Sequence, residues 1–313
     1  MRGGALPPHG LFIRTRTVGS PGRKRRYVPE AVPYLAPGLG FLALIFAVPL
    51  AYSVGLSLVR WSLLRPDLGI RWAGLANFQR MLTDPFTWQT LGRTLFFVVG
   101  AVVLELFLGT ITAFALHRGL PGSRVITSII LVPFMMTPVV AAFAWRFLLN
   151  NDFGPLPWLF RWLGWTALVD PPVLANPALV LPVLIGLDAW QAFPFVTLVV
   201  LAGLKALPAE PFEASLVDGA GAWQRLWHIT IPLLRPAFLV AVVIRTLSAL
   251  RLFDAVYVVT GGGPGSSSEV LSFYTYRMAF QSYQLGYAGA LGVLSLIVAL
   301  LMTLAYRKGI GWE

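Results

Sequence analysis

Six long apolar runs constrain this chain more than any other feature of its sequence. A helix needs about 20 apolar residues to cross roughly 30 Å of hydrocarbon, and each run is long enough. The runs lack the polar–apolar alternation of a membrane barrel, so their backbone groups must be satisfied within helices. We therefore predict an all-α membrane protein with six transmembrane helices. They are expected at residues 37–59, 94–116, 125–149, 178–203, 237–259 and 287–305.

Composition supports a membrane protein and excludes several kinds of site. Of 313 residues, 57% are hydrophobic and 12% are charged, which is more apolar surface than one soluble core could bury. The absence of cysteine excludes disulfides and thiolate metal sites. The three histidines lack metal-ligand spacing, and no phosphate-binding G-x-x-x-x-G-K-[ST] segment is present. We expect no metal and no cofactor on this chain.

The distribution of positive charge predicts the orientation of the chain. Its net charge of +11 and the run Arg23–Arg26 could indicate a nucleic-acid partner. A basic run in front of a first span is better explained as a cytoplasmic anchor, so we expect no nucleic acid. An even number of spans, with Arg307-Lys308 after the last, then places both termini in the cytoplasm. The loop after the first span opposes this rule, because five arginines lie between spans one and two: Arg60, Arg65, Arg71, Arg80 and Arg93.

Two segments of different composition follow from this interpretation. Residues 1–30 form a basic cytoplasmic tail without an early apolar region and cleavage site, so we expect the first span to remain in the mature protein. Residues 31–313 form the transmembrane domain, in which a polar segment, 204–236, separates the fourth and fifth spans.

That polar segment is predicted to fold as two short helices around a glycine turn. Pro211 suits the first turn of a helix, and Glu213 is favoured near the positive end of the helix dipole. Gly219 can take the left-handed conformation that ends a helix, and Pro232 is expected to stop the second one. The residue types alone leave two interpretations open, a docking surface for a soluble protein or an amphipathic helix lying on the membrane.

The spacing within the segment resembles the EAA loop of the membrane permeases of binding-protein-dependent ABC importers. Glu213-Ala214-Ser215 is followed by three residues, Gly219, nine residues, and then Ile229-x-Ile231-Pro232. Ser215 stands for the second alanine of the motif and Ile231 for its usual leucine. Three further stretches are similar to the sugar branch of that family, so the resemblance covers most of residues 31–308. They are Gly74–Phe78, Phe253–Pro264 and Gly286–Ala288.

The resemblance implies a type I ABC importer permease fold in a bacterial cell inner membrane. The working unit would contain a second permease subunit, two ABC ATPase subunits and an extracytoplasmic solute-binding protein. By analogy we favour a different chain as the second permease. ATP and Mg would be bound by the ATPases, so this chain would be a transport subunit and not an enzyme. The residues implied to couple it to the ATPases are Glu213, Ala214, Ser215, Asp218, Gly219, Ala220, Arg225 and Pro232.

Polar residues inside the spans are candidates for the substrate path, because a charge near the bilayer centre costs roughly 2.5–3.5 kcal/mol. Arg251 and Asp254 are three residues apart and can pair on a helix, either to fasten the fifth span or to bind substrate. Pro194 could break the fourth span, as at many transport sites. Glu105 and Arg146 are expected to be structural. The predicted path residues are Trp190, Gln191, Arg245, Ser248, Arg251, Phe253, Asp254 and Tyr257, although any single aromatic could serve only packing.

Three functions are compared at this stage. The first is import of a sugar by alternating access, with a disaccharide such as trehalose or maltose as the preferred substrate. The second is import of glycerol 3-phosphate, because Arg245 and Arg251 could hold a phosphate. The third is an ion-coupled secondary transporter in which Asp254 or Glu105 carries the ion. A membrane enzyme is not supported, because the ionisable residues are scattered along the chain.

Overall fold

The computed structural model describes residues 32–119 and 121–309. The predicted basic tail, 1–30, lies outside the described residues. The chain divides into two compact units, residues 1–49 and 50–313, and the first contributes only the beginning of one helix to the described part. The second unit contains all the other elements.

The regular secondary structure of the described residues is helical, apart from one short antiparallel pair of strands and an isolated bridge between Ser62 and Gln284. In that pair, β1 (Val59–Arg60) places Val59 opposite Trp72 of β2 (Arg71–Trp72). The helices are α1 (Val32–Ser57), α2 (Ala76–Thr83), α3 (Pro85–His117), α4 (Ser123–Met135), α5 (Pro138–Leu148), α6 (Pro155–Trp162), α7 (Val180–Lys205), α8 (Glu210–Val217), α9 (Ala222–Arg225), α10 (Ile231–Leu233), α11 (Arg235–Ala249), α12 (Leu271–Tyr276) and α13 (Leu285–Gly309).

Four of these helices are long and apolar enough to cross a membrane, and the number rises to six if each of two bent helix pairs is one span. The four are α1, α3, α7 and α13. The bent pairs are α4 with α5, which meet at 96°, and the segment Ala222–Leu233 with α11, which meet at 60°. Pro194 lies inside α7, which continues without interruption, so no break occurs in the fourth predicted span.

The third predicted span, 125–149, is broken where a straight helix was expected. Met136 and Thr137 are extended, with ψ angles of 143° and 144°. Pro138 explains the extension of Thr137, because a proline ring disfavours the helical region for the residue before it.

The fifth predicted span, 237–259, also differs, because α11 ends at Ala249. The chain then unwinds before a π-helical turn at Val256–Thr260. Within the unwound stretch the carbonyl of Leu252 accepts a hydrogen bond from the Ser272 hydroxyl. A side chain from α12 therefore replaces the helical hydrogen bond that is lost.

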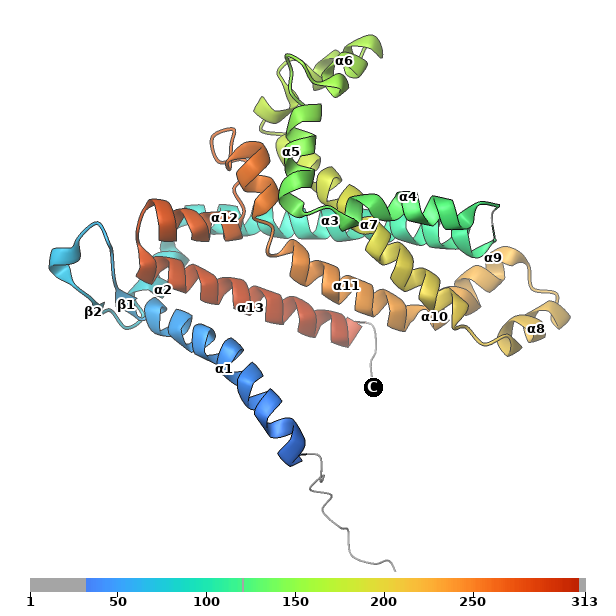
Figure 1. Ribbon diagram of the computed structural model, residues 1–313, viewed down its shortest axis with the longest axis horizontal. Coiled ribbons are helices and arrows are strands. Elements are labelled where there is room, and N and C mark those ends of the chain that lie inside the picture. The colour runs from blue at the N-terminus through green and yellow to red at the C-terminus, as the bar shows by residue number, and fades with distance from the viewer. Residues whose placement is uncertain (1–31, 120, 310–313) are drawn as a thin grey trace, which may run out of the picture. The chain divides into compact units, whose positions relative to one another are not determined.

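The core of the second unit lies where α3, α7 and α11 run along one another (Figure 1). The contact of α3 with α7 depends on Gly109, because a Cβ atom at this position would lie 2.6 Å from Val196 Cβ and 3.0 Å from the Phe193 carbonyl oxygen. Real Cβ atoms do not approach other atoms this closely, so any side chain at this position forces the two helices apart.

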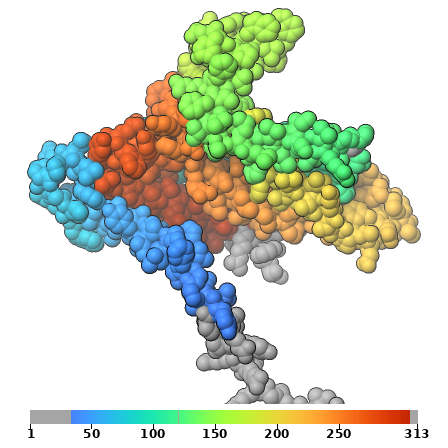
Figure 2. Space-filling model, in the orientation of Figure 1, coloured from blue at the N-terminus to red at the C-terminus, as the bar shows by residue number. Residues whose placement is uncertain are grey.

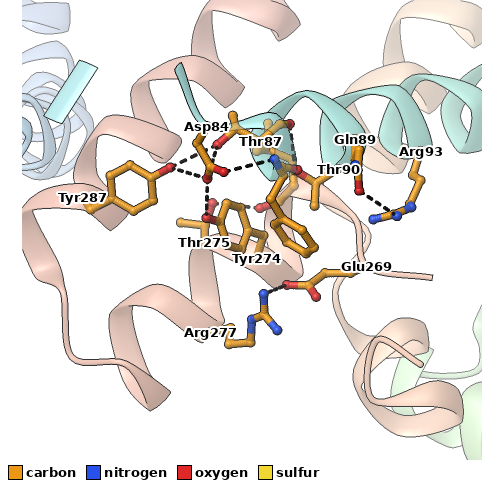
Figure 3. Close-up of polar contacts among 12 residues, drawn as sticks. Asp84, Thr87, Gln89, Thr90, Arg93, Glu269, Tyr274, Thr275, Arg277 and Tyr287 are labelled. Carbon is orange, nitrogen blue, oxygen red and sulfur yellow. Dashed lines mark hydrogen bonds and ion pairs between the residues drawn. The ribbon is translucent and has the colours of Figure 1, made fainter. Parts of the chain in front are cut away.

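A polar network fastens α12 and α13 to the beginning of α3 (Figure 3). Asp84, which precedes α3, accepts hydrogen bonds from the Phe86 backbone N–H and from the Thr87, Tyr274 and Tyr287 hydroxyls, at 3.0 to 3.1 Å. Burial tends to raise the pKa of Asp84, but these hydrogen bonds outweigh it and lower the pKa below its usual value. The carboxylate therefore stays ionised and joins three helices.

A second contact of this kind lies beside the network. Arg277, at the end of α12, pairs with the buried Glu269 at 3.0 Å (Figure 3), and its guanidinium lies over the rings of Phe86 and Tyr274. Burial is the main cause that raises the pKa of Glu269, and the positive charges of Arg277 and Arg93 oppose it. Together these contacts fix segment 261–284 on α3.

We predict that Gly109→Ala destabilises the protein by about 1–3 kcal/mol, because the added methyl group overpacks the contact of α3 with α7. Gly92→Ala is the matched control, since Gly92 is an exposed residue of the same helix with open space around its Cβ position. Alanine should stabilise that site by roughly 0.5–1 kcal/mol. Thermal unfolding in detergent measures both changes, and equal melting temperatures for the two variants would contradict the close approach.

Candidate functional site

A polar cavity of about 300 Å³ lies beside α7. Two helix breaks meet there, the one between α4 and α5 and the unwound stretch that follows α11. Met136 and Pro138 line it from the break between α4 and α5. Asp188 and Gln191 line it from α7, and residues from Arg245 to Ala255 line it from the end of α11 and the unwound stretch. Broken helices in the middle of spans are a common setting for transport sites, because they expose polar backbone and side-chain groups inside the membrane.

A group of three charged residues lies at one side of this cavity, and two of them, Asp188 and Arg245, line it. Arg245 Nε donates to Glu105 Oε2 at 2.6 Å, and Arg245 Nη2 donates to Glu105 Oε1 at 2.9 Å. The same Nη2 donates to Asp188 Oδ2 at 2.9 Å. Glu105 comes from α3, Asp188 from α7 and Arg245 from α11, so the group ties three helices together. The bidentate geometry compensates the cost of burying the Glu105 carboxylate, whose side chain is 0% exposed.

The structure brings six of the eight predicted path residues together in this cavity. They are Gln191, Arg245, Ser248, Arg251, Phe253 and Asp254. The other two residues pack beside it without lining it. Trp190 lies against Trp145, with 6.0 Å between ring centroids, and Tyr257 stacks on Phe253 at 5.4 Å.

One predicted contact within this set is wrong, and the partners of another residue were not predicted. The pair between Arg251 and Asp254 does not form among the described residues, because α11 ends before both of them and their helical spacing is lost. Arg251 Nε instead donates to the Leu247 carbonyl at 3.3 Å. Arg245 lines the cavity, and its Nε and Nη2 are engaged by two carboxylates, which leaves Nη1 as its guanidinium nitrogen without a recorded acceptor in the described part of the chain.

Sequence reasoning missed the role of Asp188, although this residue lies beside the predicted Trp190 and Gln191. An acidic residue in the middle of an apolar span was the available signal. Glu105 was expected to be structural, and the partner that the sequence did not indicate is Arg245. Arg146 is structural as well, since its Nη1 donates to the Val258 carbonyl at 2.8 Å.

Segment 204–236 contains the two short helices that the sequence predicts, α8 and α9, with Gly219 in the left-handed conformation between them at φ +73°. Pro211 and Glu213 lie in the first turn of α8, also as predicted. Pro232 does not stop the second helix. A π-helical turn at Leu226–Thr230 precedes it, the helix continues through α10, and the bend follows at Leu234.

The predicted coupling residues are distributed around two surface grooves. Glu213 lines a groove of about 570 Å³ with His117 from the end of α3 and Lys205 from the end of α7. A second groove, of about 410 Å³, is lined by Asp218, Gly219, Ala220 and Arg225. Of the remaining three, Ser215 is buried and donates to the Phe212 carbonyl at 2.7 Å, Ala214 is exposed and Pro232 is half-buried.

Large apolar side chains are exposed around these grooves. Val217 is 89% exposed and Trp223 is 70% exposed. Figure 2 shows the segment, in yellow to orange, at the surface of the second unit and at the opposite end of that unit from the loop that carries β1 and β2. Exposed apolar residues beside charged ones are typical of a surface that binds another protein or a membrane.

Comparison with known proteins identifies the family. The family described as "Binding-protein-dependent transport system inner membrane component" matches residues 105–308, which include the charged group, the cavity and segment 204–236. The chain is 34% identical to the trehalose/maltose transport system permease protein MalF of Thermococcus litoralis, over 75% of this chain and 78% of that protein. It is 32% identical to the trehalose transport system permease protein SugA of Mycobacterium tuberculosis, over 91% and 87% of the two chains.

The fold is similar to that of a solved transporter. A chain of a bacterial ABC transporter involved in the import of the acidic polysaccharide alginate superposes with a TM-score of 0.73, covering 89% of this chain and 93% of that one at 21% identity. The match of the family over most of the second unit agrees with the motif at residues 213–232. The chain belongs to the family of binding-protein-dependent transport system inner membrane components.

Proposed function

We propose that this chain is the permease subunit of an ATP-driven importer that moves a neutral sugar, a disaccharide such as trehalose or maltose, across the inner membrane by alternating access. The family carries the transport function. The names of the relatives that transport trehalose or maltose support a sugar. The polar cavity at the two helix breaks is the observation that supports a substrate path within this chain.

The charges around the cavity favour a neutral solute over glycerol 3-phosphate. Among the residues that line the cavity, Arg245 and Arg251 contribute two positive charges and Asp188 and Asp254 contribute two negative ones, so the formal sum is zero. The bidentate edge of Arg245, Nε with Nη2, already binds the Glu105 carboxylate, so it is not available to hold a phosphate in the same way. A carboxylate, an amide and a hydroxyl instead offer acceptors and donors that suit sugar hydroxyls, and Phe253 offers a ring face to the C–H groups of a sugar.

The proposed unit has six spans, two of them bent, with both termini in the cytoplasm. Its partners would be a second, different permease chain, two ABC ATPase subunits that bind ATP and Mg, and an extracytoplasmic solute-binding protein. Segment 204–236 would be the coupling element on the ATPases, with Glu213 and Arg225 in its two grooves as polar contacts and the exposed apolar residues around them as the docking face.

The ion-coupled alternative is less well supported by the geometry. Glu105 would have to exchange an ion with water during transport, but its side chain is 0% exposed and both of its oxygens accept hydrogen bonds from Arg245. Asp254 lines the cavity and could bind a cation. The uptake experiment described next therefore also tests transport driven by an ion gradient.

We expect uptake into proteoliposomes to require ATP, the ATPases and the solute-binding protein. Trehalose or maltose should stimulate ATP hydrolysis and accumulate inside, and glycerol 3-phosphate should do neither because the residues that line the cavity carry no excess positive charge. Radiolabelled uptake and phosphate release are the measurements. Uptake by the purified chain alone, driven by a sodium or proton gradient without ATP, would contradict an importer subunit.

Ser248→Ala should reduce the maximal uptake rate roughly two- to tenfold, because it removes one hydroxyl from the cavity and one hydrogen bond is worth about 0.5–1.5 kcal/mol. The rate is measured with saturating sugar-loaded binding protein, so that capture of the sugar is not limiting. Ser128→Ala, at an exposed position of α4, is the control and should leave the rate unchanged. Equal rates for both variants would remove Ser248 from the path.

Glu213→Lys should reduce sugar-stimulated ATP hydrolysis and uptake by about tenfold or more, because it reverses a charge in the groove beside His117 and Lys205. Glu210→Lys makes the same charge change in the same turn of α8, at an exposed position outside the groove, and should retain both activities. Co-purification of the ATPases with each variant separates lost assembly from lost coupling. Normal assembly and normal uptake in Glu213→Lys would be incompatible with its role in coupling.

A further inference from the structure

A second and larger cavity, of about 640 Å³, lies between the loop after α1 and the beginning of α13. Four arginines line it, and its remaining lining is apolar, aromatic or uncharged polar. The arginines are Arg60, Arg65, Arg71 and Arg80. We call this the arginine cavity. It is distinct from the proposed sugar path, because no lining residue is shared between them.

The positive charge of the arginine cavity is not balanced by the residues that line it. No carboxylate is among them, and the ion pairs found within the described part of the chain involve other arginines. Asp67 is in the same loop but does not line the cavity. Four guanidinium groups around one space repel each other, and an anion in that space removes the repulsion.

Two of the arginines are held in place by neutral partners. Arg80 Nη1 donates to Gln284 Oε1 at 2.7 Å, and its guanidinium lies 4.2 Å from the centroid of the Tyr287 ring. Arg71 Nε donates to the Leu68 carbonyl at 3.0 Å. These contacts orient the guanidinium groups without neutralising them, so each keeps further N–H donors for an anion.

The arginine cavity lies at the ends of two apolar helices. β1 begins two residues after the last residue of α1, while Gly286 and Tyr287 line the cavity from the first turn of α13. The arginine cavity and segment 204–236 lie at opposite ends of α3. Helix α2, which lines the arginine cavity, directly precedes the first residue of α3, whereas the groove of Glu213 includes His117, the last residue of α3. The 33 residues of α3 separate the two sites by about 50 Å.

The same loop exposes large apolar side chains. Leu64 is 66% exposed, Ile70 62% and Trp72 75%. Figure 2 shows this loop, in light blue, standing out at the edge of the second unit. Aromatic and apolar side chains beside arginines at the end of a span are typical of the boundary between headgroups and acyl chains.

We propose that the arginine cavity binds the phosphate of an anionic phospholipid headgroup in the outer leaflet. Arginine forks match phosphate oxygens in bidentate geometry, and a cavity with four of them can hold one phosphate from several sides. Leu64 lines the cavity, and the exposed Ile70 and Trp72 of the same loop offer apolar contacts for the glycerol and acyl chains of such a lipid. This assignment rests on the proposed orientation, with both termini in the cytoplasm, and a bound anionic lipid then explains why the loop carries so many arginines against the usual charge rule.

The test uses the purified full chain in a neutral detergent, titrated with phosphatidylglycerol or phosphatidylcholine and analysed by native mass spectrometry and thermal unfolding. Arg60→Gln with Arg65→Gln changes the two arginines of the cavity whose side chains have no recorded hydrogen bond within the described residues, unlike those of Arg71 and Arg80. At about 1 kcal/mol per arginine, phosphatidylglycerol should bind this double variant roughly thirtyfold more weakly. Phosphatidylcholine should bind both proteins equally, which shows that the variant is folded.

Two further variants sharpen the test. Arg161→Gln, at an exposed position of α6 outside the cavity, should keep the affinity for phosphatidylglycerol. A second double variant, Arg60→Lys with Arg65→Lys, keeps the charge without the fork and should bind with intermediate affinity.

Three results would overturn the proposal. One is unchanged phosphatidylglycerol affinity in the Gln double variant. Another is equal thermal protection by inorganic phosphate, which would assign the cavity to a free anion. The third is loss of solute-binding-protein docking in the Gln double variant without any change in lipid binding, which would assign it to an acidic protein surface.

Discussion

The ion pair between Glu105 and Arg245 is the interaction on which the arrangement of the membrane domain depends. It joins α3 to α11 at the level of the polar cavity, and the additional bond from Arg245 to Asp188 brings in α7. An unpaired charge at this depth would cost several kcal/mol. Removal of one partner from the buried pair would leave the other with this cost. The three helices that form the core therefore have one favourable alignment in which all three charges are paired.

Pairing also determines the chemistry that remains available to a solute. One guanidinium serves two carboxylates, so the group carries a net negative charge and leaves part of Asp188 facing the cavity. The residue that suggested a phosphate site in the sequence, Arg245, thereby becomes part of the wall. The excess of arginine lies at the far end of α3, in the loop around Arg60 and Arg65, well away from the path.

The sequence predicted those features that depend on local composition. The apolar runs located the long helices, and the spacing of Glu213, Gly219 and Pro232 identified the family and the two short helices. Prediction failed where a contact joins distant residues. Glu105 and Arg245 are 140 residues apart, so neither span could indicate the other as its partner. The assumed pair of Arg251 and Asp254 relied on a helix continuing past Ala249, and the contact that replaces the helix comes from Ser272, which lies in a different segment.

The two helix breaks and the cavity are one feature of the fold. Irregular backbone inside a membrane is tolerated where other protein groups satisfy it or where it lines a cavity. At the first break, Gln191 Nε2 donates to the Met136 carbonyl at 3.0 Å, and at the second, Ser272 donates to the Leu252 carbonyl. Ser272 belongs to α12, which the Asp84 network fastens to α3 through Tyr274. The side chains that stabilise the unwound backbone thus come from α7 and from α12, at the end of α3 that Asp84 begins. A displacement of either element therefore changes the shape of the cavity.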